Sequence, residues 1–221
     1  MRVFKRLAVA AAGTSLLVAP LFAATAASAA TKAPAATKAP ASTKAPAGHS
    51  ASVYLRGGTT TVTTAPGIAL TLIENGIVPV GVAPGTEQLK LVNSAPAAQF
   101  AFPVTGGKVS LSPLGGTIDH RGGILFADYK TGKQVEVSNF VINLTQGDLT
   151  GIVNGNPSAR VALFTLSLAH AKLSAGRHCL RATGITVDLT SGAAAALNSA
   201  LGTTLFSGGL DLGTAATSVR F

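Results

Sequence analysis

The chain has 221 residues, of which 17 are Lys or Arg, 8 are Asp or Glu, and one is cysteine. Six of the basic residues precede residue 52, so the rest of the chain carries 11 basic and 8 acidic side chains. This near balance excludes a typical nucleic-acid binder, which gathers positive charge on its folded face. The single cysteine excludes an intramolecular disulfide.

Residues 1–29 have the three-part pattern of a bacterial-type signal peptide. Arg2, Lys5 and Arg6 form a positive start, residues 7–22 are almost all apolar, and residues 27–29 are small enough for cleavage. We therefore expect export, a mature chain that begins near residue 30, and no transmembrane segment after cleavage.

Residues 30–51 form a linker built on the repeated unit Thr-Lys-Ala-Pro-Ala. The regularly spaced prolines prevent a lasting helix and favour extended conformers, so we expect a disordered Lys/Ala/Pro-rich spacer. Lys32, Lys38 and Lys44 leave two interpretations open. They attract an anionic cell wall or surface polymer, or they belong to a solvated spacer that only provides reach.

Residues 52–221 are expected to form a single domain that is mostly β. Its architecture is an antiparallel sheet or sandwich, or a partly closed barrel, with two short helices. The sequence predicts helices at 68–74 and 191–201, each followed by Asn or Gly. Alternating apolar residues and flanking turn residues predict strands at 59–63, 99–104, 108–111, 116–119, 124–127, 185–189 and 203–206.

Two other segments have more specific signatures. Between residues 134 and 144 the apolar alternation changes parity near Ser138 and Asn139, which predicts a strand with a bulge. The turn sequence Asn-Gly-Asn-Pro at 154–157 predicts a hairpin that joins strands at 149–153 and 160–168.

Catalytic motifs are not evident in the chain. It has no Gly-x-Ser-x-Gly elbow, no His-Glu-x-x-His pair and no P-loop. Asp119, His120 and Arg121 follow a predicted strand and precede a Gly-Gly turn, so we expect them on a loop at the rim of the domain. Two interpretations stay open: a binding site, or a hydrogen-bonded set that fixes the turn.

The segment at 115–126, Gly-Gly-Thr-Ile-Asp-His-Arg-Gly-Gly-Ile-Leu-Phe, resembles the Htaa-type modules. These are secreted or surface-anchored domains of Gram-positive, actinobacterial-type bacteria, and some of them bind haem. The runs 137–144, 147–153 and 161–166 share the resemblance, which extends over residues 52–173. In haem-binding members, a tyrosine ahead of a Gly-Gly pair ligates the iron and a histidine supports it. By position, the resemblance implies that Tyr54 and His120 meet within hydrogen-bond reach, with Arg56, Asp119 and Arg121 at the supporting rim.

These observations favour an exported, non-enzymatic, β-rich surface or extracellular binding module. We expect it to be secreted or associated with the cell wall, and to hold no resident cofactor. A haem-binding protein of the Htaa type is the alternative, and an exported hydrolase is the second alternative.

Overall fold

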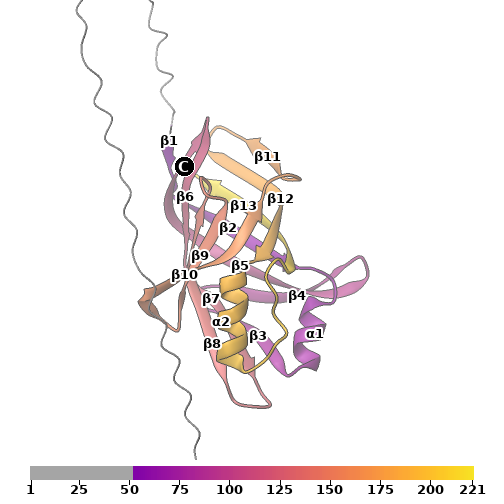
Figure 1. Ribbon diagram of the computed structural model, residues 1–221. Coiled ribbons are helices and arrows are strands. Elements are labelled where there is room, and N and C mark those ends of the chain that lie inside the picture. The colour runs from indigo at the N-terminus through magenta and orange to yellow at the C-terminus, as the bar shows by residue number, and fades with distance from the viewer. Residues whose placement is uncertain (1–51) are drawn as a thin grey trace, which may run out of the picture. The chain divides into compact units, whose positions relative to one another are not determined.

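The computed structural model describes residues 52–221, and the signal-peptide and linker predictions for residues 1–29 and 30–51 lie outside this range (Figure 1). The described part contains one sheet of 13 strands and two helices, so the mostly β prediction is confirmed. Neither of these helices is long and apolar enough to cross a membrane.

Eight antiparallel strands of the described sheet close into a barrel. Strand β6 closes the ring because it pairs with β5 on one edge and with β8 on the other. In order around the ring, the strands are β5 (Ala95–Leu111), β2 (Gly57–Thr64), β13 (Asp211–Arg220), β12 (Cys179–Leu189), β10 (Asn156–Ser167), β9 (Asp148–Val153), β8 (Gln134–Asn143) and β6 (Leu114–His120). The barrel alternative of the predicted fold is therefore the correct one, and its ring is fully closed.

The other strands of the described part extend the sheet beyond the ring. They are β1 (Ser52–Tyr54), β3 (Ile77–Val82), β4 (Thr86–Val92), β7 (Gly123–Asp128) and β11 (Lys172–Ala175). β1 and β4 pair with β5, β11 pairs with β12, and β7 pairs with β8 and β3. β4 also approaches β3, because the Glu87 carboxylate accepts a hydrogen bond from Gly81 N. β3, β4 and β7 lie at the end of the barrel near the helices (Figure 1).

Both helices form where the sequence predicts them, α1 at Ile68–Glu74 and α2 at Ser191–Leu201. α2 begins after Thr190, whose hydroxyl accepts a hydrogen bond from Ala193 N (3.1 Å), and it ends at the left-handed Gly202. The same hydroxyl donates to Ala162 O (2.8 Å), which ties the helix to β10. α2 packs on β8 and β10, and α1 packs on β3 and β5. The two helices thus cover different parts of the barrel wall.

The predicted bulge in β8 is confirmed. The pairing of β8 with β9 shifts register between Ser138 and Val141, and Asn139 has a φ of 51°. Because of this extra residue, Val137 and Phe140 both face the interior, although they differ by an odd number of positions. The predicted hairpin is also confirmed, since β9 and β10 pair across the turn at 154–155.

Two strand predictions are corrected by the structure. The segments 99–104 and 108–111 belong to one long strand, β5. Residues 203–206 do not form a strand. The backbone of Phe206 bonds to a side chain instead of a strand. The Asn198 side-chain amide donates to Phe206 O (2.8 Å) and accepts from Phe206 N (3.0 Å). A side chain of α2 therefore takes both backbone groups that a sheet partner would use.

Candidate functional site

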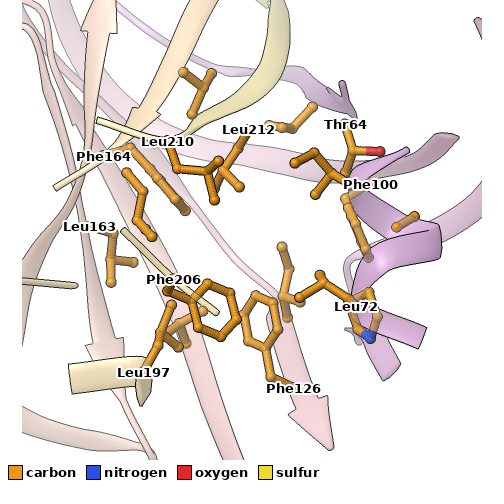
Figure 2. Close-up of a pocket in the computed structure, with 18 of the residues that line it drawn as sticks. Thr64, Leu72, Phe100, Phe126, Leu163, Phe164, Leu197, Phe206, Leu210 and Leu212 are labelled. Atoms are coloured by element: carbon orange, nitrogen blue, oxygen red, sulfur yellow. The ribbon is translucent and has the colours of Figure 1, made fainter. Parts of the chain in front are cut away.

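An apolar cavity of about 170 Å³ lies inside the barrel end between the two helices. Its wall includes Ala69 and Leu72 of α1, Leu197 of α2, inward-facing residues of the barrel strands, and the segment 205–212. Figure 2 shows these side chains converging on an open centre. Among the described residues that line it, only Thr64 and Thr71 have polar side chains. The Thr64 hydroxyl already accepts a hydrogen bond from Ala98 N (3.0 Å), so the cavity offers a ligand almost purely apolar contact.

Two aromatic pairs form part of the cavity wall. Phe126 of β7 and Phe206 pack edge to face, with ring centroids 6.2 Å apart, and Figure 2 shows both rings at one side of the space. Phe102 and Phe140 pack in the same manner at 4.9 Å. Phe206 depends on Asn198, whose amide binds its backbone on both sides. Asn198 is therefore a positioning residue for this part of the wall.

A chain of three buried polar side chains crosses the barrel interior beside this cavity. Nε2 of His120 lies 2.7 Å from the Thr60 hydroxyl, which in turn lies 2.9 Å from the Thr217 hydroxyl. Nδ1 of His120 lies 3.3 Å from Phe140 O. The three side chains come from β6, β2 and β13, so the chain connects strands that are far apart in the sequence.

The direction of these hydrogen bonds follows from the acceptor groups. A carbonyl oxygen only accepts, so Nδ1 of His120 carries a proton and donates to Phe140 O. Burial lowers the pKa of His120 to about 4, so the ring is neutral and Nε2 accepts from the Thr60 hydroxyl. Thr60 has then used its only proton, and Thr217 must donate to it. All three groups are satisfied without an ionised ring.

This polar chain separates two apolar spaces. Phe102 lies directly opposite Thr60 on the neighbouring strand, and it lines the main cavity. Thr217 lines a second, smaller cavity of about 40 Å³ on the other side. Phe102 and Phe140 line the main cavity, whereas Thr60, His120 and Thr217 do not.

His120 is not on a rim loop, and this prediction is wrong. It is the last residue of β6, and its side chain is only 4% exposed. The alternation of the strand explains the placement, since Ile118 and His120 share the inward face. Three consecutive polar residues are typical of a loop, but here the side chain of the middle one, His120, belongs to the barrel interior.

Tyr54 lies on the opposite face of the barrel wall from His120. Tyr54 is directly opposite Lys108 of β5, which is directly opposite Thr117 of β6, and such neighbours share a face. Thr117 and His120 are three positions apart on one strand, so they point to opposite faces. Accordingly, the Tyr54 side chain is 70% exposed and its ring centroid lies 5.2 Å from Lys108 Nζ.

The three supporting residues of the predicted rim lie outside the barrel interior that holds the His120 side chain. Asp119 alternates with His120 and faces the other side of β6. Arg121 is exposed, and its backbone N donates to Pro103 O (3.2 Å). Arg56 is exposed beyond the end of β1, where its backbone N donates to Arg220 O (2.8 Å).

The residues present do not fit the haem site that the Htaa-type resemblance implies. That site needs a tyrosine and a histidine within hydrogen-bond reach, but Tyr54 faces solvent and both ring nitrogens of His120 have partners inside the barrel. The cavity is comparable in volume to one that binds benzene, and a porphyrin is several times larger than benzene. Within residues 52–221, no group of three or more His, Cys, Asp or Glu residues is placed to hold a metal ion.

The described residues define a small closed antiparallel barrel with an apolar interior and two helices. Among solved structures, it is similar to the C-terminal domain of HtaA from Corynebacterium glutamicum, with a TM-score of 0.52 and 16% sequence identity. This match covers 76% of the present chain and 98% of that chain, so the predicted Htaa-type fold is confirmed. A domain-swapped dimer of the same domain, with one histidine replaced by alanine, matches with a TM-score of 0.45 and 18% identity over 69% of this chain and 89% of that one. The sequence matches no family model and no curated protein.

The cavity and the polar chain beside it are the features that sequence reasoning missed. The strands that carry Phe102, Phe140 and Leu163 are predictable, but the space between them exists only once the ring closes. Thr60 and Thr217 are 157 positions apart, and nothing in their neighbourhoods marks them as partners. The one available signal is strand parity, which places His120 on the same face as Ile118.

Proposed function

We propose that the protein is an exported, non-enzymatic binding module that holds a small apolar molecule in the cavity between α1 and α2. The observation that carries this proposal is a space of about 170 Å³ whose described lining is apolar except for two threonines. A cavity of about 150 Å³ lined by Leu, Ile and Phe stays dry and binds benzene. An eight-stranded barrel is also just wide enough to hold one small ligand.

The packing of the cavity wall supports the same proposal. A wall atom that borders a void lacks contact partners on that side, so an apolar molecule that enters the cavity gains dispersion contacts there. Leu72, Phe126 and Phe206 are among the side chains that would supply these contacts.

Export and surface location belong to the same proposal. The pattern of residues 1–29 supports export, and Lys32, Lys38 and Lys44 support retention at an anionic cell-wall or surface polymer. The mature chain should therefore begin near residue 30 and be recovered from culture fluid or from the cell wall.

Haem binding is a second candidate, since the Htaa-type fold is present. Because Tyr54 and His120 lie on opposite faces of the wall, haem bound through Tyr54 would lack the supporting histidine that the resemblance implies. The two proposals differ in their ligand site. The apolar-ligand proposal depends on the cavity, whereas haem binding through Tyr54 depends on the outer surface of β1.

Thermal unfolding of the purified protein with benzene tests the proposal. At ten times its Kd, a ligand that binds only the folded state stabilises it by ~1.4 kcal/mol, which raises Tm by ~3 to 6 °C. Ala69 lines the cavity from α1, so Ala69→Phe and the smaller Ala69→Leu should reduce or abolish this rise. The exposed Ala196 of α2 gives the control Ala196→Phe, which should retain it. A wild-type Tm that benzene leaves unchanged contradicts the proposal.

A further inference from the structure

Two leucines of β4 are exposed to an unusual degree. Leu89 is 78% exposed and Leu91 is 76% exposed, and they are the most exposed of the large apolar side chains in the described part of the chain. β4 pairs with β5 and forms a hairpin with its first half. Figure 1 shows this hairpin reaching out from the barrel on the same side as α1. Exposed apolar side chains at adjacent positions on one face commonly mark an interaction site.

The register places both leucines on the face that continues the barrel interior. Leu89 is directly opposite Ala98, and Leu91 is directly opposite Pro96. Ala98 and Phe100 share one face of β5, because they are two positions apart on the strand. Phe100 lines the cavity and Ala98 packs against the core. On β5 this face is apolar from Phe100 to Pro96, and on β4 it carries Leu89, Leu91 and Glu87, which is directly opposite Phe100. The Glu87 carboxylate is held by Gly81 N. The apolar surface therefore continues from the cavity along β5 toward Leu89 and Leu91.

α1 lies alongside this apolar surface. The helix packs on β5, and Ala69 and Leu72 face the cavity. Leu70 and Ile73 of the same helix remain 47% and 43% exposed. The helix and the hairpin thus each present two large exposed apolar side chains.

Ala98, Leu89 and Leu91 are not among the described residues that line the cavity. Its volume is close to that of a site for a single benzene ring. A compact ligand would fill it without meeting Leu89 or Leu91, and it would leave these side chains in water. Only an extended ligand contacts both regions at once.

We propose that the natural ligand is a chain-like apolar molecule, such as an unbranched alkyl or acyl chain. This rests on the proposed function, since one end of the chain occupies the cavity. The rest of the chain lies along β5 and covers Leu89 and Leu91. Any polar head group of the ligand is then held outside the barrel, which agrees with the lack of ionisable side chains among the described lining residues.

A chain-length series tests this inference. Saturated fatty acids from hexanoate to hexadecanoate, kept below their micelle concentrations, compete with a fluorescent alkyl probe for the purified full-length mature protein. Affinity should rise with length beyond what the cavity accommodates. The double variant Leu89→Ser, Leu91→Ser should weaken the longest acid at least tenfold, because covering two leucine side chains contributes more than the free-energy change of one decade in Kd. The same variant should leave the shortest acid unchanged.

The control is the double variant Leu111→Ser, Leu173→Ser, which removes two exposed leucines that lie outside this apolar surface. It should bind every acid as the wild type does. If the short acid binds but affinity does not rise with length, or the β4 variant weakens all lengths equally, the chain-like ligand is wrong and the cavity proposal stands. If no acid binds and benzene does not raise Tm, the proposed function is wrong as well.

Discussion

The Thr60 hydroxyl lies 2.7 Å from Nε2 of His120 inside the barrel, and it connects β2 to β6. Through Thr217, 2.9 Å farther on, the same hydroxyl also reaches β13. Because this one buried hydroxyl bonds side chains of two other strands, its removal should lower the stability of the barrel. Two members of the chain also adjoin residues of the cavity wall, since Thr60 is directly opposite Phe102 and Nδ1 of His120 donates to Phe140 O.

Thr60→Val should lower the free energy of unfolding by about 2 kcal/mol or more. The substitution keeps the side-chain shape but leaves Nε2 of His120 and the Thr217 hydroxyl without their partner, and each orphaned buried group costs ~1 to 3 kcal/mol. Thr61→Val is the matched control, since the Thr61 hydroxyl makes only a longer, part-buried bond to Ala216 O (3.3 Å). Urea unfolding of both variants measures the difference. An equal loss of unfolding free energy in Thr60→Val and Thr61→Val would contradict the proposal that the Thr60 hydroxyl stabilises the barrel.

Stability should fall as the pH is lowered through the range in which only the unfolded state binds a proton at His120. Burial lowers the pKa of folded His120 to about 4, whereas an unfolded histidine has a pKa of ~6.5. Above pH ~6.5 His120 is neutral in both the folded and the unfolded protein, so its protonation does not reduce the free energy of unfolding there. Between pH ~6.5 and ~4 the free energy of unfolding falls progressively, by an amount on the order of 3 kcal/mol.

The His120 ring signal in an NMR titration gives the direct check of this pH dependence. The ring should stay in its neutral form until the pH approaches 4. A comparison of urea unfolding at pH 7 and pH 5 for the wild type and His120→Gln should show a weaker pH dependence in the variant. A titration midpoint near 6.5 in the folded protein contradicts the buried, neutral histidine.

Gly122→Ala should be far more destabilising than Gly155→Ala. Both glycines have positive φ, 89° and 67°, so both substitutions carry a backbone penalty of ~1 to 2 kcal/mol. At Gly122 an added methyl group would also collide with the backbone of Gly85, whereas at Gly155 it meets nothing within 4 Å. The collision should add ~2 kcal/mol or more. Similar thermal unfolding of the two variants would show that the contact between the β6–β7 connection and Gly85 is not tight.

Hemin should not bind through Tyr54. The Tyr54 ring faces solvent next to Lys108, on the opposite side of the barrel wall from His120. The absorption spectrum of a hemin mixture should therefore be the same for the wild type, Tyr54→Phe and His120→Gln. A ferric-tyrosinate spectrum that is lost in Tyr54→Phe would contradict this placement and would restore the haem alternative.

Local features of the fold could be predicted from the sequence because their signals are local. The helix at 191–201 is alanine-rich and is bounded by Thr190 and Gly202, which supply its caps. The change of parity near Asn139 is visible in the apolar pattern itself and marks the bulge of β8. The turn at 154–157 likewise carries its own residue preferences.

Long-range features could not be predicted in this way. Closure depends on β6 pairing with both β5 and β8, and no short segment encodes that choice. β4 is almost entirely exposed, so its alternation carries no burial signal. The cavity results from the arrangement of strands and helices around a common space, and the pairing of Thr60 with Thr217 spans 157 positions.

A crystal structure of the protein under xenon pressure, or soaked in benzene, tests the central proposal most directly, because it reports both binding and place. Density should appear inside the barrel end, in contact with Leu72, Phe126 and Phe206, and should be missing in Ala69→Phe. An empty or collapsed cavity, with density confined to the outer surface, would contradict the proposal that this barrel holds an apolar ligand.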